Sequence, residues 1–278
     1  AVMSAILKVE NLNVTLHHRR ASKKLVENVS FEVRPGECLG ILGESGSGKS
    51  MTVKSVLGLL DKNFQVSGSA IFDGQDLLKE SKEELRRLRG SRITMVLQNP
   101  MTCFDPLYRI GNQMAETFAT HTSRNAQEIR THSLEILEQM RIRNGEEVLE
   151  KYPHQLSGGM LQRIMIGIAM ALQPELLIAD EPTTAIDAIT QYEILEEFIR
   201  IKKQKNTAML FITHDLGAIS RVADRILVMN SGHVVDSGSF DHILKHADDP
   251  YTRMLVEKRS AVMQRYRQIL HGKEESSH

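Results

Sequence analysis

The sequence has no tryptophan, only two cysteines and no excess of charge of either sign. Cys38 and Cys103 lack the paired spacing of a disulfide framework or a zinc knuckle, so we expect a reducing compartment. Lys and Arg together number 35, as do Asp and Glu, and this balance excludes the basic excess usual in proteins that wrap nucleic acid. We therefore expect no nucleic-acid partner.

Long apolar runs are missing as well. The longest, residues 164–172, is far shorter than the ~20 residues that a helix needs to cross a bilayer. The basic residues near the start, Arg19, Arg20, Lys23 and Lys24, are followed by a polar, strand-like stretch rather than by the apolar segment of a signal peptide. We expect a chain that is soluble by itself and reaches any membrane through a partner.

Short apolar runs alternate with helical patterns along most of the chain. Five of these runs are continuous rather than alternating: residues 38–42, 93–97, 176–179, 209–212 and 226–229. Continuous runs of this length are typical of strands in a sheet that is covered on both faces. Between them lie helical patterns such as residues 49–60 and 192–203. The alternation predicts an α/β fold with a mostly parallel sheet.

The beginning, the middle and the end of the chain depart from this pattern. Residues 6–16 and 25–33 alternate like solvent-facing antiparallel strands, which predicts an antiparallel β subdomain. From about residue 99 to 155 helical periodicity replaces the strand pattern, which predicts a helical insert. We expect one main domain over residues 4–250 and a C-terminal helical tail over residues 251–278.

A glycine-rich segment follows the first buried run and leads into a helix. It fits the phosphate-binding pattern G-x-x-x-x-G-K-[ST] and continues by one residue: Gly43, Glu44, Ser45, Gly46, Ser47, Gly48, Lys49, Ser50 and Met51. The glycines let backbone N–H groups turn toward phosphate oxygens, and the helix N-terminus adds positive potential. Lys49 can bridge the β- and γ-phosphates of ATP, and Ser50 can bind Mg²⁺. The alternative is a glycine-rich turn without a ligand.

Two carboxylates, Asp180 and Glu181, directly follow the apolar run at residues 176–179. This order puts both at the carboxyl edge of the sheet, where ligands bind in α/β folds. Asp180 would hold magnesium, directly or through water, and Glu181 would act as general base on the attacking water. The alternative is the solvated start of a loop, and the phosphate-binding pattern upstream favours the catalytic interpretation.

A second anion-binding pattern, formed by Ser157, Gly158 and Gly159, precedes the apolar helix at residues 164–172. A chain with one P-loop does not need two phosphate sites for one nucleotide. Residues 156–163 resemble the signature sequence of ABC ATPases, which covers the γ-phosphate of ATP held by the other subunit of a dimer. By itself the pattern is equally typical of a helix cap.

Three further residues resemble ABC motifs in the expected order. Gln98 resembles the Q-loop glutamine that senses magnesium and water, and His214 resembles the switch histidine that contacts the γ-phosphate beside the catalytic glutamate. Asp187 lies in a segment that resembles the D-loop, with Ile186 in place of the usual leucine. The resemblance covers residues 7 to about 254. It implies a P-loop NTPase of the ABC ATPase fold, which hydrolyses ATP with Mg²⁺ as half of a nucleotide-sandwich dimer.

One feature departs from the family pattern. Many ABC ATPases stack adenine on an aromatic residue shortly before the second strand, but residues 16–20 contain no Phe, Tyr or Trp. His17, His18, Leu16 and Arg20 all remain candidates for the contact with the base.

Several segments resemble the peptide/nickel importer branch of the ABC family: residues 98–107, 110–114 and 249–253. Residues 159–163 and 189–192 resemble the nickel and metal-chelate members more closely, and no cysteine cluster follows Cys103 as in some peptide importers. The resemblance implies nickel or a metal chelate as substrate, with di- or oligopeptides as the alternative. A soluble ABC ATPase acting on nucleic acid is disfavoured, because the chain has neither a second cassette nor a long coiled-coil insert.

The same resemblance implies the partners and the location. We expect transmembrane permease subunits, a second and different ATPase subunit, and indirectly an extracytoplasmic solute-binding protein, at the cytoplasmic face of the plasma membrane. Met101, Phe104, Leu107 and Tyr108 follow Gln98 closely, and we expect them to form an exposed apolar cluster that docks on the permease. The alternative for this cluster is local core packing.

Overall fold

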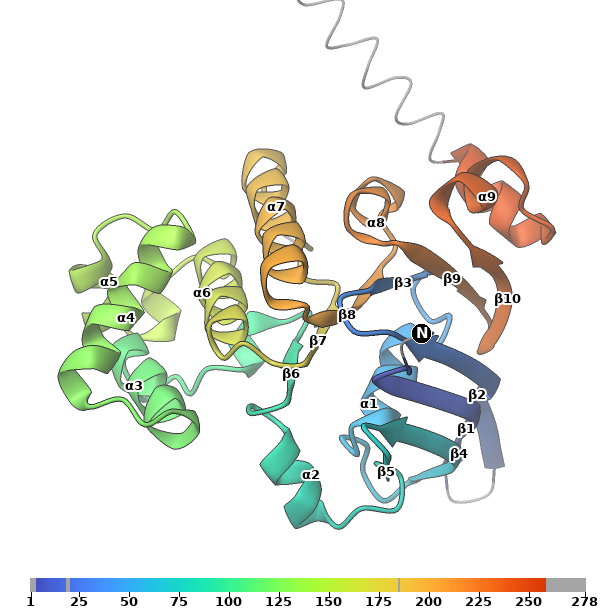
Figure 1. Ribbon diagram of the computed structural model, residues 1–278, viewed down its shortest axis with the longest axis horizontal. Helices are drawn as coiled ribbons and strands as arrows, with labels where there is room; N and C mark the ends of the chain where they lie inside the picture. Colours follow the sequence, from blue (N-terminus) through green and yellow to red (C-terminus); the bar gives the residue numbers. More distant parts are fainter. Residues whose placement is uncertain (1–3, 19–20, 185, 259–278) are drawn as a thin grey trace, which may run out of the picture.

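The computed structural model describes residues 4–18, 21–184 and 186–258, which build two sheets with helices around them (Figure 1). The smaller sheet is antiparallel and has the order β2-β1-β4-β5. Its strands are β1 (Leu7–His18), β2 (Ala21–Val33), β4 (Phe64–Phe72) and β5 (Gln75–Asp76). The sheet matches the predicted antiparallel subdomain, although β4 and β5 have no counterpart in the apolar pattern of the sequence.

The larger sheet has the order β10-β9-β3-β8-β7-β6. Its strands are β3 (Cys38–Leu42), β6 (Ile93–Val96), β7 (Leu176–Asp180), β8 (Ala208–Thr213), β9 (Arg225–Asn230) and β10 (His233–Gly238). The five predicted apolar runs form its parallel strands, and β10 pairs antiparallel with β9 at one edge.

Both faces of this sheet are covered, which explains why its central strands are apolar throughout. Leu176 and Ile178 of β7 belong to a core shared with the antiparallel sheet and with α1 (Lys49–Val56). The alternate residues Leu177 and Ala179 pack on the opposite face. Three helices cover that face: α6 (Gly158–Ala171), α7 (Ala188–Lys205) and α8 (Leu216–Val222). Every residue of β7 is therefore buried.

The helical insert lies between β6 and β7, on the side of the molecule away from the antiparallel sheet (Figure 1). It contains η1 (Pro100–Thr102), α3 (Ile110–His121), α4 (Ala126–Gln139), α5 (Gly145–Glu150) and η2 (Pro153–Gln155). The side chain of Asn125 accepts from the Glu128 N–H, and the Glu128 carboxylate accepts from the Asn125 N–H, so a capping box starts α4.

Some elements differ from their predicted extent. Helix α1 ends at Val56 rather than near residue 60, and Gly58 follows with φ +62°, a conformation that stops a helix. Helix α2 (Lys82–Leu88) was not expected, and it begins where the Ser81 side chain accepts from Glu84 N–H. After α9 (Phe240–Lys245), residues 250–258 are helical, and residues 259–278 of the expected tail lie outside the described residues.

The expectation that Phe104 is exposed was wrong. Its side chain is only 8% exposed and belongs to the core under the helical insert, whereas Met101, Leu107 and Tyr108 are 47%, 79% and 56% exposed. A phenyl ring gains more free energy from burial than a smaller side chain, and this segment has a core within reach. Local packing therefore holds Phe104, and the other three residues are exposed apolar side chains of the same segment.

Candidate functional site

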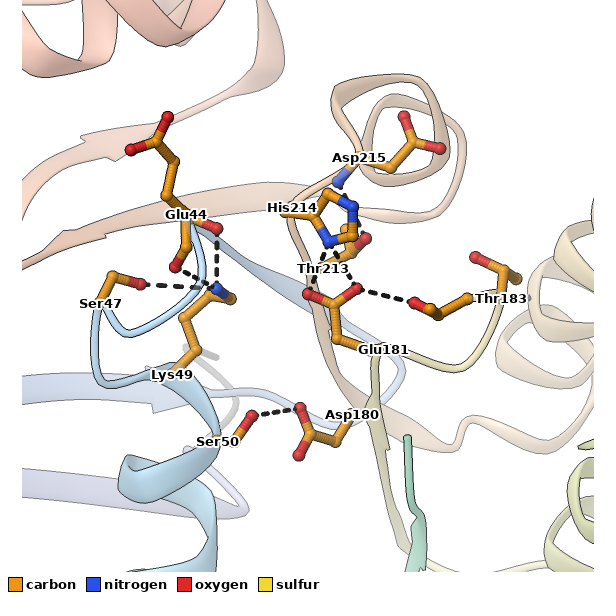
Figure 2. Close-up of polar contacts among 12 residues, drawn as sticks. Glu44, Ser47, Lys49, Ser50, Asp180, Glu181, Thr183, Thr213, His214 and Asp215 are labelled. Carbon is orange, nitrogen blue, oxygen red and sulfur yellow. Dashed lines mark hydrogen bonds and ion pairs between the residues drawn. The ribbon is translucent and has the colours of Figure 1, made fainter. Parts of the chain in front are cut away.

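Three neighbouring parallel strands end at one edge of the larger sheet. Leu42 at the end of β3 pairs with Thr213 of β8, and Asp180 at the end of β7 pairs with Ile212 of the same strand. The segments that follow these three strands are the P-loop, Glu181 and His214, and Figure 2 shows Ser50 facing Asp180 and Glu181 facing His214. Residues that are far apart in the sequence thus meet because their strands are adjacent.

The P-loop is shaped by its glycines. A Cβ on Gly43 would lie 2.4 Å from the Met229 carbonyl oxygen, and Gly48 has φ +100°, where other residues are strained. The buried Lys49 ammonium donates to the carbonyl oxygens of Gly43 at 2.7 Å and Glu44 at 2.9 Å. The loop thus surrounds the positively charged Lys49 ammonium at the start of α1, and a phosphate site requires such a concentration of positive charge.

Ser50 and Asp180 form the second part of the site (Figure 2). The Ser50 hydroxyl donates to Asp180 Oδ1 at 2.7 Å, and the Asp180 side chain is 2% exposed. Burial raises the pKa of Asp180, and the neighbouring Glu181 adds to this, while Ser50, Lys54 and Lys49 act in the opposite direction. Burial therefore makes the ionised carboxylate less stable than it is in water, and a divalent cation would stabilise it.

These two oxygen donors fit Mg²⁺, which prefers hydroxyl and carboxylate oxygens and usually keeps water and phosphate ligands as well. In the described part of the chain, no group of three or more His, Cys, Asp or Glu residues is arranged to hold a metal. A magnesium site at Ser50 and Asp180 would therefore be completed by nucleotide and water, as is usual for this ion.

Glu181 and His214 are in direct contact. The Nδ1 atom of His214 lies 2.9 Å and 2.8 Å from the two carboxylate oxygens of Glu181, and the Thr184 hydroxyl donates to Oε2 at 3.2 Å. Glu181 is buried and has φ +51°, although it is not a glycine, and its N–H donates to the Ile212 carbonyl. Strained backbone of this kind persists where the surroundings hold it, commonly at functional sites.

A second group of polar contacts supports the loop after β8. The Gln191 amide of α7 donates to Asp215 Oδ2 at 3.0 Å, and Asp215 Oδ1 accepts from Gly217 N–H at the start of α8. Because Asp215 follows His214 directly, the hydrogen bond from Gln191 joins α7 to the residue next to the switch-like histidine. Sequence reasoning missed Gln191 as a supporting residue, since nothing in its spacing relates it to Asp215.

Gln162 is a further residue that sequence reasoning missed. It is 1% exposed on α6, and its amide donates to the Pro182 carbonyl at 2.8 Å and to the Leu97 carbonyl at 3.5 Å. Pro182 follows Glu181, and Leu97 precedes Gln98, so one side chain of α6 contacts both segments. The available signal was a single glutamine in a helix in which most positions after Arg163 are apolar.

Other predicted residues lie apart from this cluster. Gln98 is exposed, and in the described part of the chain no hydrogen bond joins it to Ser50 or Asp180. Ser157 starts α6 by accepting from Met160 N–H, and the adjoining Gly158 is exposed, with nothing within 4 Å of an added Cβ. Gly159 is the second residue of α6, one position further along.

Asp187 is also exposed, at the start of α7, where its side chain accepts from Thr190 N–H. Hydrogen bonds from Thr190 lower the pKa of Asp187. Ala185 in the D-loop-like segment lies outside the described residues, as does Arg20, one of the candidates for contact with the base. Another candidate, His17, has its Nε2 atom 2.9 Å from Gln65 Oε1.

Comparison with known proteins decides the family. A family model described as "ABC transporter" matches residues 26–184. The chain belongs to the ABC transporter family. It is 43% identical over 267 residues to the metal-staphylopine import system ATP-binding protein CntD of Staphylococcus aureus, and the match covers 96% of this chain and 98% of CntD.

Two further members of the family are similar to this chain: one is named for dipeptide transport, and the other is a cassette of known structure. The chain is 40% identical over 259 residues to the dipeptide transport ATP-binding protein DppD of Lactococcus lactis, covering 92% of this chain and 74% of DppD. Its fold matches the dimeric structure of MJ0796, a bacterial ABC transporter cassette, with a TM-score of 0.76 at 25% identity, over 84% of this chain and 98% of that one. These matches confirm the predicted ABC ATPase fold and the predicted activity, ATP hydrolysis coupled to transport.

Proposed function

We propose that this ABC-type ATPase powers the import of nickel or of a metal chelate. The observation that carries the proposal is its 43% identity to CntD over almost the full length of both chains, because CntD is named as part of a metal-staphylopine import system. Import of di- or oligopeptides is the alternative, and the 40% identity to DppD supports it. Among the described helices, none has the length and apolar character needed to cross a bilayer.

In the proposed mechanism the P-loop, residues 43–51, holds the phosphates of ATP, and Lys49 contacts the β- and γ-phosphates. Ser50 and Asp180 would hold Mg²⁺, with Gln98 as a further ligand, and the ion would neutralise charge on the phosphates. Glu181 accepts a proton from the attacking water as general base. His214, which contacts both carboxylate oxygens of Glu181, orients that carboxylate.

The exposed predicted residues fit a site that is completed between two subunits. Ser157 and Gly158 are exposed and Gly159 is half-buried at the N-terminus of α6, where the three residues can cover the nucleotide of a second, different ATPase subunit. Asp187 would lie at the same interface. In this proposal residues 4–250 form the ATPase domain and residues 251–278 a C-terminal tail. The dimer acts below permease subunits at the cytoplasmic face of the plasma membrane, with a solute-binding protein outside.

The substrate is tested with the whole transporter in proteoliposomes together with its solute-binding protein. ATP hydrolysis is compared in the presence of nickel, nickel chelates and a mixed peptide pool. We expect stimulation by nickel or a chelate. Stimulation by peptides alone would overturn the metal assignment and leave the ATPase assignment in place.

Ser157→Arg is expected to leave ATP binding at the chain's own P-loop unchanged and to block closure of the dimer. The long side chain would fill the open space in front of Gly158, where the partner's nucleotide is proposed to lie. The measurements are ATP binding, dimer mass with ATP, and the hydrolysis rate, with Ser157→Ala as the control that removes only the helix cap. Normal closure and hydrolysis by Ser157→Arg would mean that Ser157 is only a cap.

Leu107→Asp is expected to uncouple transport while basal ATP hydrolysis stays within about twofold. Leu107 is 79% exposed in the same segment as the exposed Met101 and Tyr108, so a charge there should have a small effect on folding and a large one on an apolar docking contact. Substrate uptake and hydrolysis are measured in proteoliposomes. Leu59→Asp is the matched control, because Leu59 is another exposed leucine and lies outside the insert. An equal loss of uptake in both variants would contradict the docking role.

A further inference from the structure

The helix at residues 250–258 lies directly against the nucleotide site. Leu255 and Val256 are buried in a core that also contains Leu42 at the end of β3 and Leu216 of α8. Between this helix, the P-loop and His214 the remaining cavity is only ≈ 10 Å³, too small for a ligand. The C-terminal helix therefore packs closely on the segments that carry the P-loop and the switch-like histidine.

Tyr251 connects this helix to the P-loop through one hydrogen bond. Its hydroxyl accepts from the backbone N–H of Glu44 at 3.0 Å, across 207 residues of sequence. Lys258, about two helical turns after Tyr251, has its ammonium 3.9 Å from Glu44 Oε1, but both groups are more than half exposed. The ion pair is thus weak, and the Tyr251 contact is the specific one.

The position of Tyr251 is itself fixed. Asp249 Oδ1 accepts from the backbone N–H groups of Tyr251 at 2.8 Å and Thr252 at 3.3 Å, which starts the helix. The buried Asp236 carboxylate of β10 in turn accepts from the N–H groups of Asp248 and Asp249. Burial raises the pKa of the Tyr251 hydroxyl above its usual value near 10; the hydrogen bond from the Glu44 N–H opposes this and the Glu44 charge adds to it, so the hydroxyl is protonated at neutral pH.

The bonded N–H of Glu44 belongs to the same peptide unit as the Gly43 carbonyl. That carbonyl accepts from the Lys49 ammonium at 2.7 Å. A trans peptide unit is planar, and its N–H and C=O point in opposite directions, so the two groups can only turn together. Tyr251 on one side and Lys49 on the other therefore hold this unit in one orientation.

We propose that Tyr251 is a positioning residue for ATP binding: by holding the Glu44 N–H, it fixes the Gly43–Glu44 peptide unit and through it the Lys49 ammonium. The inference rests on the proposed contact of Lys49 with the phosphates. A loop already held in its binding conformation loses less entropy when the nucleotide binds. The C-terminal helix thereby sets the affinity of the P-loop for ATP.

Tyr251→Phe tests this, because it removes the hydroxyl and keeps the ring. We expect the Kd for a fluorescent ATP analogue and the KM for ATP to rise about fivefold, the effect of one hydrogen bond, while kcat and the melting temperature stay nearly unchanged. Tyr108→Phe, at an exposed tyrosine of the helical insert, and Lys258→Ala are the controls and should change neither Kd nor KM. An unchanged KM, or a loss of kcat alone, would overturn the proposal.

Glu44→Pro provides an independent test, because proline has no N–H to donate. In that background Tyr251→Phe should have no further effect on the Kd for the analogue, whereas a full additional fivefold rise would show that the hydroxyl acts elsewhere. Lys49→Ala, measured in parallel on the full-length chain, separates the positioning role of Tyr251 from the phosphate contact of Lys49. If it weakens binding and Tyr251→Phe does not, only the positioning role fails; if Lys49→Ala has no effect, the phosphate contact itself fails.

Discussion

Glu181→Gln is expected to bind ATP with near-normal affinity and to lose nearly all hydrolysis, roughly 10²–10⁴-fold, which is the usual contribution of a positioned general base. The amide keeps the shape of the carboxylate but cannot accept the proton of the attacking water. The Thr184 hydroxyl can still donate to the amide oxygen, and His214 can still approach it. Because binding persists and hydrolysis stops, ATP-bound closed dimers should accumulate.

The measurements for Glu181→Gln are the ATPase rate, ATP affinity and the mass of the dimer in the presence of ATP. Glu83→Gln on the exposed face of α2 is the matched control for loss of one carboxylate and should behave like the unchanged protein. Near-normal turnover by Glu181→Gln would contradict the general-base role in this chain. The ATPase measurement on Glu181→Gln would then be repeated with the second ATPase subunit inactivated, which shows whether that subunit's site carries the remaining turnover.

The central sheet and the position of the site could be predicted from the sequence because they depend on local signals. A strand covered on both faces must be apolar throughout, so β3, β7 and β8 appear as continuous runs. Polar residues that follow such runs must lie at the sheet edge, which is why Lys49, Asp180 and His214 could be expected near one another.

Non-local contacts could not be predicted in the same way. Strand β4 contains Ser67, Gly68 and Ser69, which are poor strand formers, and it exists because it pairs with β1. Phe104 follows an exposed segment, yet the core beneath it decides its burial. The bond between Tyr251 and Glu44 joins a helix and the P-loop, and their separation in the sequence carries no information about their distance.

The strain at Glu181 was equally invisible in the sequence. Glutamate has no preference for φ +51°, and Glu181 adopts it while its N–H donates to the Ile212 carbonyl of the neighbouring strand. That geometry turns the carboxylate toward His214 rather than along the strand. The residue type was predictable from the pattern of apolar and acidic residues, whereas its orientation required the neighbouring strand.

Lys49→Ala is expected to weaken ATP binding itself, in contrast to Glu181→Gln. Hydrogen bonds from an ammonium to a charged partner contribute about 1.5–3 kcal/mol each, so the loss of one such bond should lower the affinity roughly 10- to 150-fold, and the loss of contacts to both phosphates should lower it further. The lost bonds to the Gly43 and Glu44 carbonyls loosen the loop as well, which adds to the effect. Equilibrium binding of a labelled ATP analogue measures it, with Lys62→Ala at an exposed turn as the control for loss of one positive charge. Unchanged affinity in Lys49→Ala would contradict the phosphate contact, and hydrolysis should fall together with binding because the site can only hydrolyse ATP that it holds.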